Sequence, residues 1–304
     1  VRQADLEQVL EAFSRARYLL VLLAAVIQLV TLGIIAIRWQ RIFIIRPKFF
    51  QLFRVLLISQ LANIILPIRL GVLIRAYLVG RQERVSKTLV FGSVLSEKVF
   101  DSLLFVLLFV ALFPFVSPNW VRWSSLPLSV GIFFALFPVM FLVTYRRQWF
   151  LRCVRKISEQ FSLTRRFSLS KRVEIALEGL SPLQGIGFIA SLWGWTLLIA
   201  GLGIFVNHTM MRAFEIQIPL IAAAFLLVAL QIGNRVLPAP LGGMGVFQYI
   251  CVRALGFFSV DAPQALSFGF MLHFVIFLPG SLLGVLFFFQ TNESLDELKM
   301  AAKD

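Results

Sequence analysis

The stretch Gln60–Gly71 reads QLANIILPIRLG, and the stretch Gln231–Gly242 reads QIGNRVLPAPLG. The two stretches are identical at six of twelve positions, with a constant offset of 171 residues. The shared pairs are Gln60/Gln231, Asn63/Asn234, Leu66/Leu237, Pro67/Pro238, Leu70/Leu241 and Gly71/Gly242. Because Pro and Gly interrupt helices, and because Gln and Asn are uncommon in apolar ones, this repeat predicts two related helix breaks.

The sequence around these breaks is too apolar for a water-soluble domain. Of its 304 residues, 59% are hydrophobic and 14% are charged, whereas about a quarter of the residues in soluble proteins are charged. The net charge of +14 comes from basic residues in short loops between apolar runs, which is typical of the cytoplasmic faces of membrane proteins. We therefore expect an all-α polytopic membrane protein with no nucleic-acid partner.

A membrane-spanning helix needs about 20 mostly apolar residues. Five segments meet this requirement, at residues 18–37, 88–113, 127–145, 187–206 and 264–289. Two further apolar segments, residues 49–66 and 216–237, contain polar residues and then reach Pro67 and Pro238. These two segments are the ones that contain the repeat.

The charges of the loops predict the orientation of the spans. Residues 38–54 and 146–181 are rich in Lys and Arg, so we expect them in the cytoplasm. Residues 114–126 and 207–217 contain few basic residues and are expected outside. If residues 49–66 crossed the membrane fully, every later loop would lie on the side opposite to the one that its charge predicts. This segment should therefore return to the side from which it enters.

The predicted return gives each half of the chain a re-entrant hairpin. Residues 49–66 are expected to break at Pro67 and return as a short helix near residues 71–80. The same argument makes residues 216–256 a second hairpin that enters from the opposite side, so the repeat is inverted. Inverted repeats with Pro/Gly-broken segments indicate a transport site near the membrane midplane. Two similar structural kinks without transport are the alternative.

This topology divides the chain into four parts. They are an external amphipathic segment (1–17), a first repeat unit (18–113), a second repeat unit (127–289, with the basic cytoplasmic loop 146–181) and a cytoplasmic tail (290–304). The first unit lacks a counterpart of the span at 127–145, so we expect one more span before Val1. The protein is expected in the inner (cytoplasmic) membrane of the cell, with its C-terminus in the cytoplasm.

Three charged residues, Glu97, Lys98 and Asp101, lie inside the expected span 88–113. Glu97 and Asp101 are four residues apart and so share one helix face. A charge near the bilayer centre costs roughly 2.5–3.5 kcal/mol, so the cluster needs partners. The available partners are Arg69, Arg75 and Arg235. Together with Gln60, Asn63, Gln231 and Asn234, these residues are predicted to line a substrate pathway for a lipid headgroup or a coupling ion. The alternative is a buried ion-pair network that only fixes the hairpins.

The breaks themselves predict an anion site. A short helix that begins after Pro67 or Pro238 points its N-terminus into the membrane, where unpaired N–H groups and the helix dipole favour an anion. Glycines at such a turn let the backbone approach a phosphate closely. The predicted helix-break and headgroup loop comprises Pro67, Gly71, Pro238, Pro240, Gly242, Gly243 and Gly245.

The sequence contains no pattern typical of an enzyme, a metal site or a bound cofactor. It has no G-x-S-x-G elbow, no H-E-x-x-H and no P-loop. Cys153 and Cys251 give neither a disulfide framework nor a zinc spacing. His208 and His273 are the only histidines, and His273 is interpreted as a packed residue in its span.

Aromatic and basic residues mark the expected membrane surfaces. Trp39 and Trp149 are predicted at the inner interface, as in the aromatic belts of membrane proteins. The loop at residues 146–172 is basic and contains apolar residues, so it is predicted to lie on anionic lipid headgroups. A basic loop that only sets the topology is the alternative.

Three motifs in order resemble the flippase-like family, which includes the membrane half of lysylphosphatidylglycerol synthases. They are Asn63-x-x-Leu66-Pro67-x-Arg69-x-Gly71-x-x-x-Arg75, Glu97-Lys98-x-x-Asp101 and Pro238-x-Pro240-x-Gly242-Gly243-x-Gly245. The resemblance covers nearly the whole chain. It implies that the protein moves a polar lipid, such as an aminoacylated phosphatidylglycerol or a polyprenyl-linked sugar, between leaflets. No soluble synthase domain is present in the sequence, so this chain is not expected to make the lipid.

Two positions differ from the pattern of that family. Val72 follows the first glycine, and Gln248 lies three residues after the last one, where the family often has Glu at both. The loss of both acids favours a passive or partner-driven role over ion coupling. The inverted repeat and the buried charges favour the leading hypothesis, a lipid translocase whose partners are membrane lipids, whereas the loss of the two acids favours its rival. The rival is a non-transporting membrane subunit that anchors or regulates an envelope-lipid glycosyltransferase or synthase.

Overall fold

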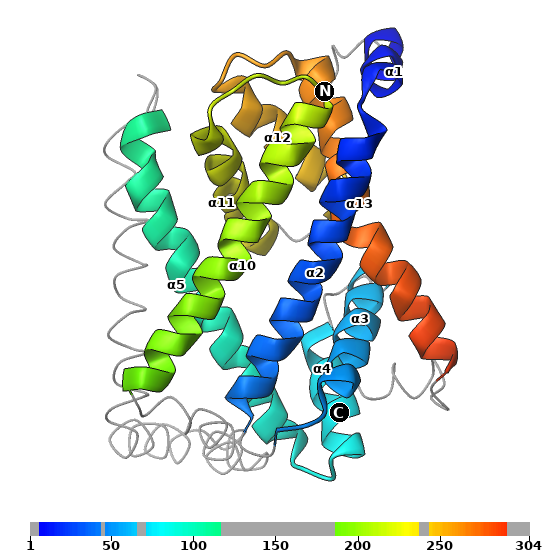
Figure 1. The fold of residues 1–304 in the computed structure, drawn as a ribbon, viewed down its shortest axis with the longest axis vertical. Helices are drawn as coiled ribbons and strands as arrows, with labels where there is room; N and C mark the ends of the chain where they lie inside the picture. The colour runs from blue at the N-terminus through cyan, green and yellow to red at the C-terminus, as the bar shows by residue number, and fades with distance from the viewer. Residues whose placement is uncertain (1–5, 44–45, 66–70, 117–185, 237–242, 291–304) are drawn as a thin grey trace, which may run out of the picture.

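The computed structural model describes residues 6–43, 46–65, 71–116, 186–236 and 243–290, and all regular structure in them is helical (Figure 1). The helices are α1 (Leu6–Arg15), α2 (Tyr18–Ile42), α3 (Phe49–Ile65), α4 (Gly71–Gln82), α5 (Lys87–Val116), α10 (Ile186–Ala213), α11 (Leu220–Val236), α12 (Val246–Gly256) and α13 (Ala262–Phe289). The expectation of an all-α membrane protein is confirmed at this level.

Three of the described helices are long and apolar enough to cross a membrane, namely α2, α10 and α13. They coincide with the spans expected at residues 18–37, 187–206 and 264–289. The expected span 88–113 lies within α5, a helix of 30 residues that also carries the predicted charge cluster. The expected span at 127–145 and the basic loop at 146–181 lie outside the described residues.

The helix α2 extends further than the sequence analysis predicted. It continues to Ile42, so Arg38 and Trp39 belong to the helix and not to a cytoplasmic loop. Both residues are buried, at 1% and 0% exposed, so Trp39 packs inside the bundle and does not face lipid as a residue of an aromatic belt would. Because Arg38 is neutralised by partners on other helices, its charge does not end the apolar span.

The helices α3 and α4 form a helical hairpin. At the break, the N–H of Gly71 donates to Asn63 Oδ1 at 2.8 Å. At the opposite end, Gln51 Nε2 donates to Gln82 Oε1 at 3.0 Å, so the two arms are antiparallel. The arms contain 17 and 12 residues, which correspond to about 25 and 18 Å at 1.5 Å per residue. Both lengths are below the roughly 30 Å of a bilayer core.

The helices α11 and α12 form a second helical hairpin of 17 and 11 residues. Phe225, near the start of α11, packs edge to face on Phe257, which directly follows α12. Gly233, near the end of α11, lies against Ile250 in the first half of α12. Figure 1 shows this hairpin in the upper half of the bundle and the α3–α4 hairpin in the lower half.

The helix α13 connects the two hairpins, because it packs on α12 and on α3. Two glycines spaced as Gly-x-x-x-Gly make the contact with α3, one against its backbone and the other against a side chain. A Cβ at Gly284 would lie 2.6 Å from the carbonyl oxygen of Leu57, and one at Gly280 would lie 2.8 Å from Gln60 Oε1. Small residues at this spacing let two membrane helices approach closely. Close packing therefore fixes the first hairpin against the C-terminal half of α13.

Candidate functional site

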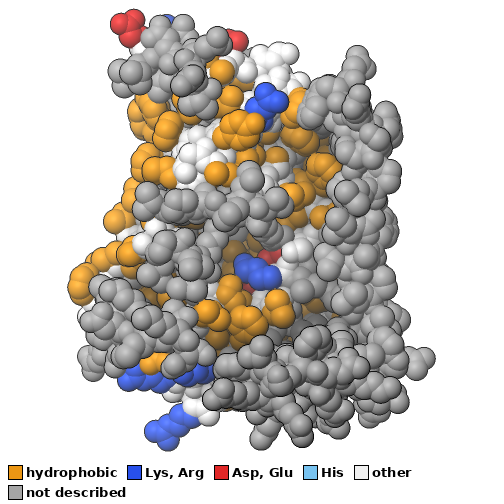
Figure 2. Space-filling view, turned by 180° about the vertical axis from the view of Figure 1, so that it is seen from behind, with side chains coloured by type: hydrophobic (Ala, Val, Ile, Leu, Met, Phe, Trp, Pro, Cys, Tyr) orange, Lys and Arg blue, Asp and Glu red, His pale blue; other side chains and the backbone are white. Residues whose placement is uncertain are grey.

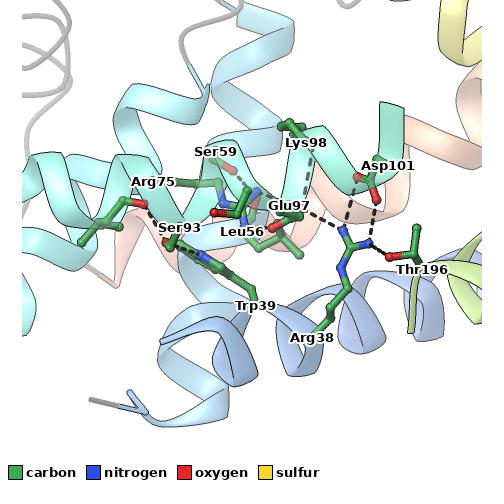
Figure 3. Close-up of polar contacts among 12 residues, drawn as sticks. Arg38, Trp39, Leu56, Ser59, Arg75, Ser93, Glu97, Lys98, Asp101 and Thr196 are labelled. Atoms are coloured by element: carbon green, nitrogen blue, oxygen red, sulfur yellow. Dashed lines mark hydrogen bonds and ion pairs between the residues drawn. The ribbon is translucent and has the colours of Figure 1, made fainter. Parts of the chain in front are cut away.

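A buried charge network joins α2, α4 and α5 (Figure 3). Arg38 Nη1 lies 2.6 Å from Asp101 Oδ1, and Arg38 Nη2 lies 3.3 Å from Glu97 Oε1. Arg75 Nη2 lies 2.9 Å from the second carboxylate oxygen of Glu97. Glu97 is thus held between two guanidinium groups, and the four residues balance to zero charge.

Arg38 extends this network to a fourth helix. Its Nη1 also donates to Thr196 Oγ1 of α10 at 3.1 Å. Thr196 in turn donates to the carbonyl oxygen of Leu192, as hydroxyls inside helices commonly do. The guanidinium of Arg38 therefore contacts side chains of α5 and α10 at the same time, and it fixes the end of α2 between them.

Arg75 is positioned by an aromatic ring as well as by Glu97. Its guanidinium carbon lies 3.9 Å from the centre of the Trp39 ring, within the distance of a cation–π interaction. The Trp39 Nε1–H donates to Ser93 Oγ of α5 at 3.1 Å. The ring is thereby held in one orientation, and Arg75 is presented to Glu97 from the hairpin.

Burial makes the network sensitive to the loss of any single charge. The side chains of Arg38, Arg75 and Glu97 are 1%, 4% and 1% exposed. In such surroundings, removing one partner of an ion pair leaves an uncompensated charge and costs about 3–5 kcal/mol. The Nε atoms of both arginines are also buried and have no hydrogen-bond partner among the described residues. Each guanidinium thus keeps one donor that a further ligand could satisfy.

One edge of the network reaches the surface of the bundle. The side chain of Lys98 is 46% exposed, and its Nζ lies 3.9 Å from Glu97 Oε1. The side chain of Asp101 is 14% exposed. Figure 2 shows a Lys or Arg side chain with acidic atoms beside it, near hydrophobic side chains and close to the middle of the view. A polar group that enters the bundle at this height would meet both signs of charge.

Polar side chains of the repeat close the first break. Asn63 accepts the N–H of Gly71, and a Cβ at position 71 would lie 2.6 Å from both Asn63 Oδ1 and the carbonyl oxygen of Ser59. Gln60 Nε2 donates to the carbonyl oxygen of Ile276 at 3.1 Å. Ile276 lies in the turn before Pro279, inside α13. The first hairpin is therefore tied by hydrogen bonds to itself and to α13.

The second break has a glycine turn that leads into α12. Gly243 and Gly245 have φ angles of 91° and 89°. These angles lie in the left-handed region, which residues other than glycine rarely adopt. The N–H of Gly245 donates to Gln248 Oε1 at 2.7 Å. Gln248 is 2% exposed, and its Nε2 has no hydrogen-bond partner among the described residues.

His273 lies beside this turn and packs between aromatic rings. Its ring centre is 5.0 Å from that of Phe247 and 4.6 Å from that of Phe277. The side chain is 5% exposed, which agrees with its interpretation as a packed residue. Its Nδ1 has no hydrogen-bond partner within the part of the chain that the structure describes.

The structure brings together only part of the predicted site. Of the predicted charged residues, Arg75, Glu97 and Asp101 meet in the network. Gln231 is half-buried on α11. The predicted residues Pro67, Arg69, Pro238, Pro240 and Gly242, and the side chains of Asn234 and Arg235, lie outside the described residues.

Three residues of the network were missed by sequence analysis, namely Arg38, Trp39 and Thr196. One signal could have identified the first two, because apolar residues resume at positions 42–45 after Gln40 and Arg41. An arginine inside an extended apolar run is a candidate for a buried ion pair. No sequence signal distinguishes Thr196 from other helix threonines.

No group of three His, Cys, Asp or Glu residues in the described part of the chain could hold a metal ion. Cys251 is buried in α12 and is a free thiol. The arrangement in the described ranges is thus one of paired charges, helix termini and amide groups. Such groups can bind and orient a polar ligand without covalent chemistry.

Comparison with known proteins identifies one family. A family model described as the Lysylphosphatidylglycerol synthase TM region matches residues 1–284. The match includes the charge network, both hairpins and nearly all of α13. No curated protein and no solved structure matches the chain.

Proposed function

The chain belongs to the family of the lysylphosphatidylglycerol synthase TM region, and on this premise we propose that it is a lipid translocase. Its substrate would be a polar lipid, anionic or linked to a polyprenyl phosphate, that moves between the two leaflets. The headgroup would cross among the polar side chains of the bundle while the acyl or prenyl tails stay in the bilayer.

The buried charge network is the observation that carries this proposal. Charges are rare in membrane spans because each is costly there, and they concentrate on substrate pathways. Here Arg38 and Arg75 would attract the phosphate of the lipid, with Arg69 and Arg235 as further candidates. Glu97 and Asp101 would hold the arginines in place when no phosphate is bound. The exposed side chain of Lys98 gives the headgroup a first contact at the surface of the bundle.

The pairing of helices supports an inverted repeat with two re-entrant hairpins. In the first unit α4 packs on α5, and in the second unit α12 packs on α13. The units also interlock, because α5 packs on α11 and α13 packs on α3. Each helix that follows a hairpin thus contacts the first arm of the other hairpin. In such an arrangement, a motion of one hairpin is transmitted directly to the other unit.

The membrane and the orientation are part of the proposal. We place the protein in the inner membrane with its C-terminus in the cytoplasm, on the basis of Arg41, Arg46 and Lys48 around the α2–α3 connection and of the basic loop at residues 146–181. The loop 146–172 would bind anionic headgroups on that side. Both assignments follow from the distribution of charge in the sequence.

One observation favours the rival role, a membrane subunit that anchors or regulates a lipid-modifying enzyme. The two arginines and two acids of the network already neutralise one another, as a purely structural network would. Val72 and Gln248 also stand where related sequences often carry acids. The two roles differ in whether the paired charges are needed for lipid movement when the fold is intact.

Reconstituted liposomes test this difference with a panel of headgroup-labelled lipids, including polyprenyl phosphates. The variant is Arg75→Met with Glu97→Gln, because it removes both members of one pair and leaves Arg38 paired with Asp101. The matched control is Arg17→Met with Glu215→Gln, which removes an exposed pair with an N–O distance of 3.0 Å. Thermal unfolding shows whether each protein is folded.

Lipid-selective flipping by the wild type and the control, and its loss in the folded network variant, is the expected result. Flipping that persists in the network variant would assign the charges a structural role. A wild type that is silent on every lipid would overturn the translocase and leave the partner-subunit role.

A further inference from the structure

We propose that the first turn of α12 is a binding subsite for a phosphate group, and that the side-chain amide of Gln248 is its specificity-determining donor. The inference rests on the proposed function for the identity of the carrier, a lipid headgroup. The subsite itself depends on the local structure of the glycine turn, and it can be tested without a transport assay.

The N-terminus of α12 presents backbone donors that have no partner inside the helix. The helix begins at Val246 after Gly245, and glycine has no side chain with which to cap it. The first backbone hydrogen bond of the turn runs from the N–H of Tyr249 to the carbonyl oxygen of Gly245 at 2.9 Å. The N–H groups of residues 246–248 therefore have no partner within the helix, and they point out of its N-terminal end. The helix dipole adds positive potential at the same place.

Gln248 adds a buried side-chain donor to these backbone groups. Its Oε1 accepts the N–H of Gly245, and this hydrogen bond fixes the orientation of the amide. The Nε2 group of the same amide is left without a hydrogen-bond partner among the described residues, although the side chain is 2% exposed. Buried amide donors in proteins are nearly always paired. A phosphate oxygen at the turn would pair it.

Among the described residues, the glycine that begins α4 and the glycine that precedes α12 have different surroundings. A Cβ at Gly71, the first residue of α4, would lie 2.6 Å from Asn63 Oδ1. At Gly245 an added Cβ would have no described atom within 4 Å. Gly71 pairs with Gly242 in the repeat, so Gly245 is not its counterpart, and among the described residues nothing packs against a Cβ at Gly245 at this distance.

The chemistry of the turn favours an anion. The groups that carry this inference are donors, since the amide oxygen of Gln248 is already used by Gly245. A carboxylate at position 248 would keep the bond to Gly245 and place a negative charge beside the ligand. The amide thus makes the subsite suited to a phosphate monoester or diester, which occurs in a lipid headgroup and in free phosphate.

Isothermal titration calorimetry on the full chain in detergent micelles tests the subsite. The probes are dihexanoylphosphatidylglycerol and inorganic phosphate, with dihexanoylglycerol as the probe without phosphate. The variant is Gln248→Glu, and Gln248→Met removes the donor without adding charge. The control is Gln51→Glu, which adds the same charge on α3, where Gln51 contacts Gln82. Thermal unfolding without probe identifies any variant that does not fold. If one Gln248 variant does not fold, the binding measured with the other Gln248 variant tests the subsite.

The expected result is that both Gln248 variants weaken phosphate binding by at least about tenfold, or about 1.4 kcal/mol, while Gln51→Glu binds as the wild type does. Binding of the lipid but not of inorganic phosphate would identify the headgroup as the source. A wild type that binds neither phosphate probe, or Gln248 variants that bind with unchanged affinity, would overturn the subsite.

These outcomes are separate from those of the flipping assay. A wild type that flips lipid but binds phosphate independently of Gln248 keeps the proposed function and loses the subsite. A wild type that binds phosphate through Gln248 but flips no lipid keeps the subsite and loses the proposed function.

Discussion

The guanidinium of Arg38 lies 2.6 Å from Asp101 Oδ1, and this pair joins the end of α2 to the middle of α5. The two residues are 63 positions apart in the chain. The same guanidinium reaches Glu97, which is also paired with Arg75 of the first hairpin. The position of the hairpin relative to α2 is therefore set by charge as well as by packing.

Arg38→Met is expected to destabilise the protein by about 3–5 kcal/mol, because it leaves Asp101 without its guanidinium inside the bundle. The double variant Arg38→Met with Asp101→Asn should recover a large part of this loss, because both charges are then removed. Chemical unfolding in detergent measures the difference. A double variant as unstable as the single one would show that packing of Arg38, and not its charge, is decisive.

Trp39→Leu is expected to lower the free energy of unfolding by more than Ser93→Ala does. The leucine removes the ring under Arg75 and the hydrogen bond to Ser93, whereas the alanine removes only the bond. One such neutral hydrogen bond contributes about 0.5–1.5 kcal/mol. Trp39→Phe keeps a ring beneath Arg75 and should fall between the two. Equal effects of Trp39→Leu and Ser93→Ala on thermal unfolding would contradict a stabilising contact between the ring and Arg75.

Gly284→Ala is expected to destabilise the contact between α13 and α3 by about 1–3 kcal/mol, because the new methyl group would overlap the carbonyl oxygen of Leu57. The matched control is Gly201→Ala in α10, where no described atom lies within 4 Å of an added Cβ. That substitution should be neutral or stabilise the helix by about 0.5–1 kcal/mol. The two variants are compared by thermal unfolding. Similar changes in both would rule out backbone-distance packing at Gly284.

Labelling of single cysteines tests whether the first hairpin re-enters the membrane. In a background with Cys153→Ser and Cys251→Ala, we expect Gln51→Cys and Gln82→Cys to react with an impermeant maleimide from the same side. Ser259→Cys, at the open end of the second hairpin, should react from the opposite side. The measurement is made on right-side-out and inverted vesicles. Labelling of positions 51 and 82 from opposite sides would show that the segment crosses the bilayer.

The helix breaks could be predicted because their causes are local. Pro67 and the Gly243–Gly245 turn favour a helix break, since proline lacks an N–H and glycine accepts a positive φ. The short helix expected near residues 71–80 is present as α4. Likewise, Glu97 and Asp101 could be placed on one face of α5, because helical spacing decides that alone.

The partners of those acids could not be predicted in full. The sequence offered Arg69, Arg75 and Arg235 because they lie near the breaks, and it assigned Arg38 to a loop because it is charged. In the structure, Arg38 is helical and 1% exposed. Whether a charge ends a span or pairs inside the bundle depends on what the neighbouring helices place opposite it.

The sequence by itself determined that the chain is an apolar helical bundle with two broken hairpins, because hydropathy and backbone preference act within a few residues. Tertiary structure alone decided that Arg38 of α2 meets Asp101 of α5 and Thr196 of α10. It also decided that Gly284 of α13 lies against the backbone of Leu57 in α3. These outcomes depend on distances between residues remote in the chain, which are set by the packing of whole helices.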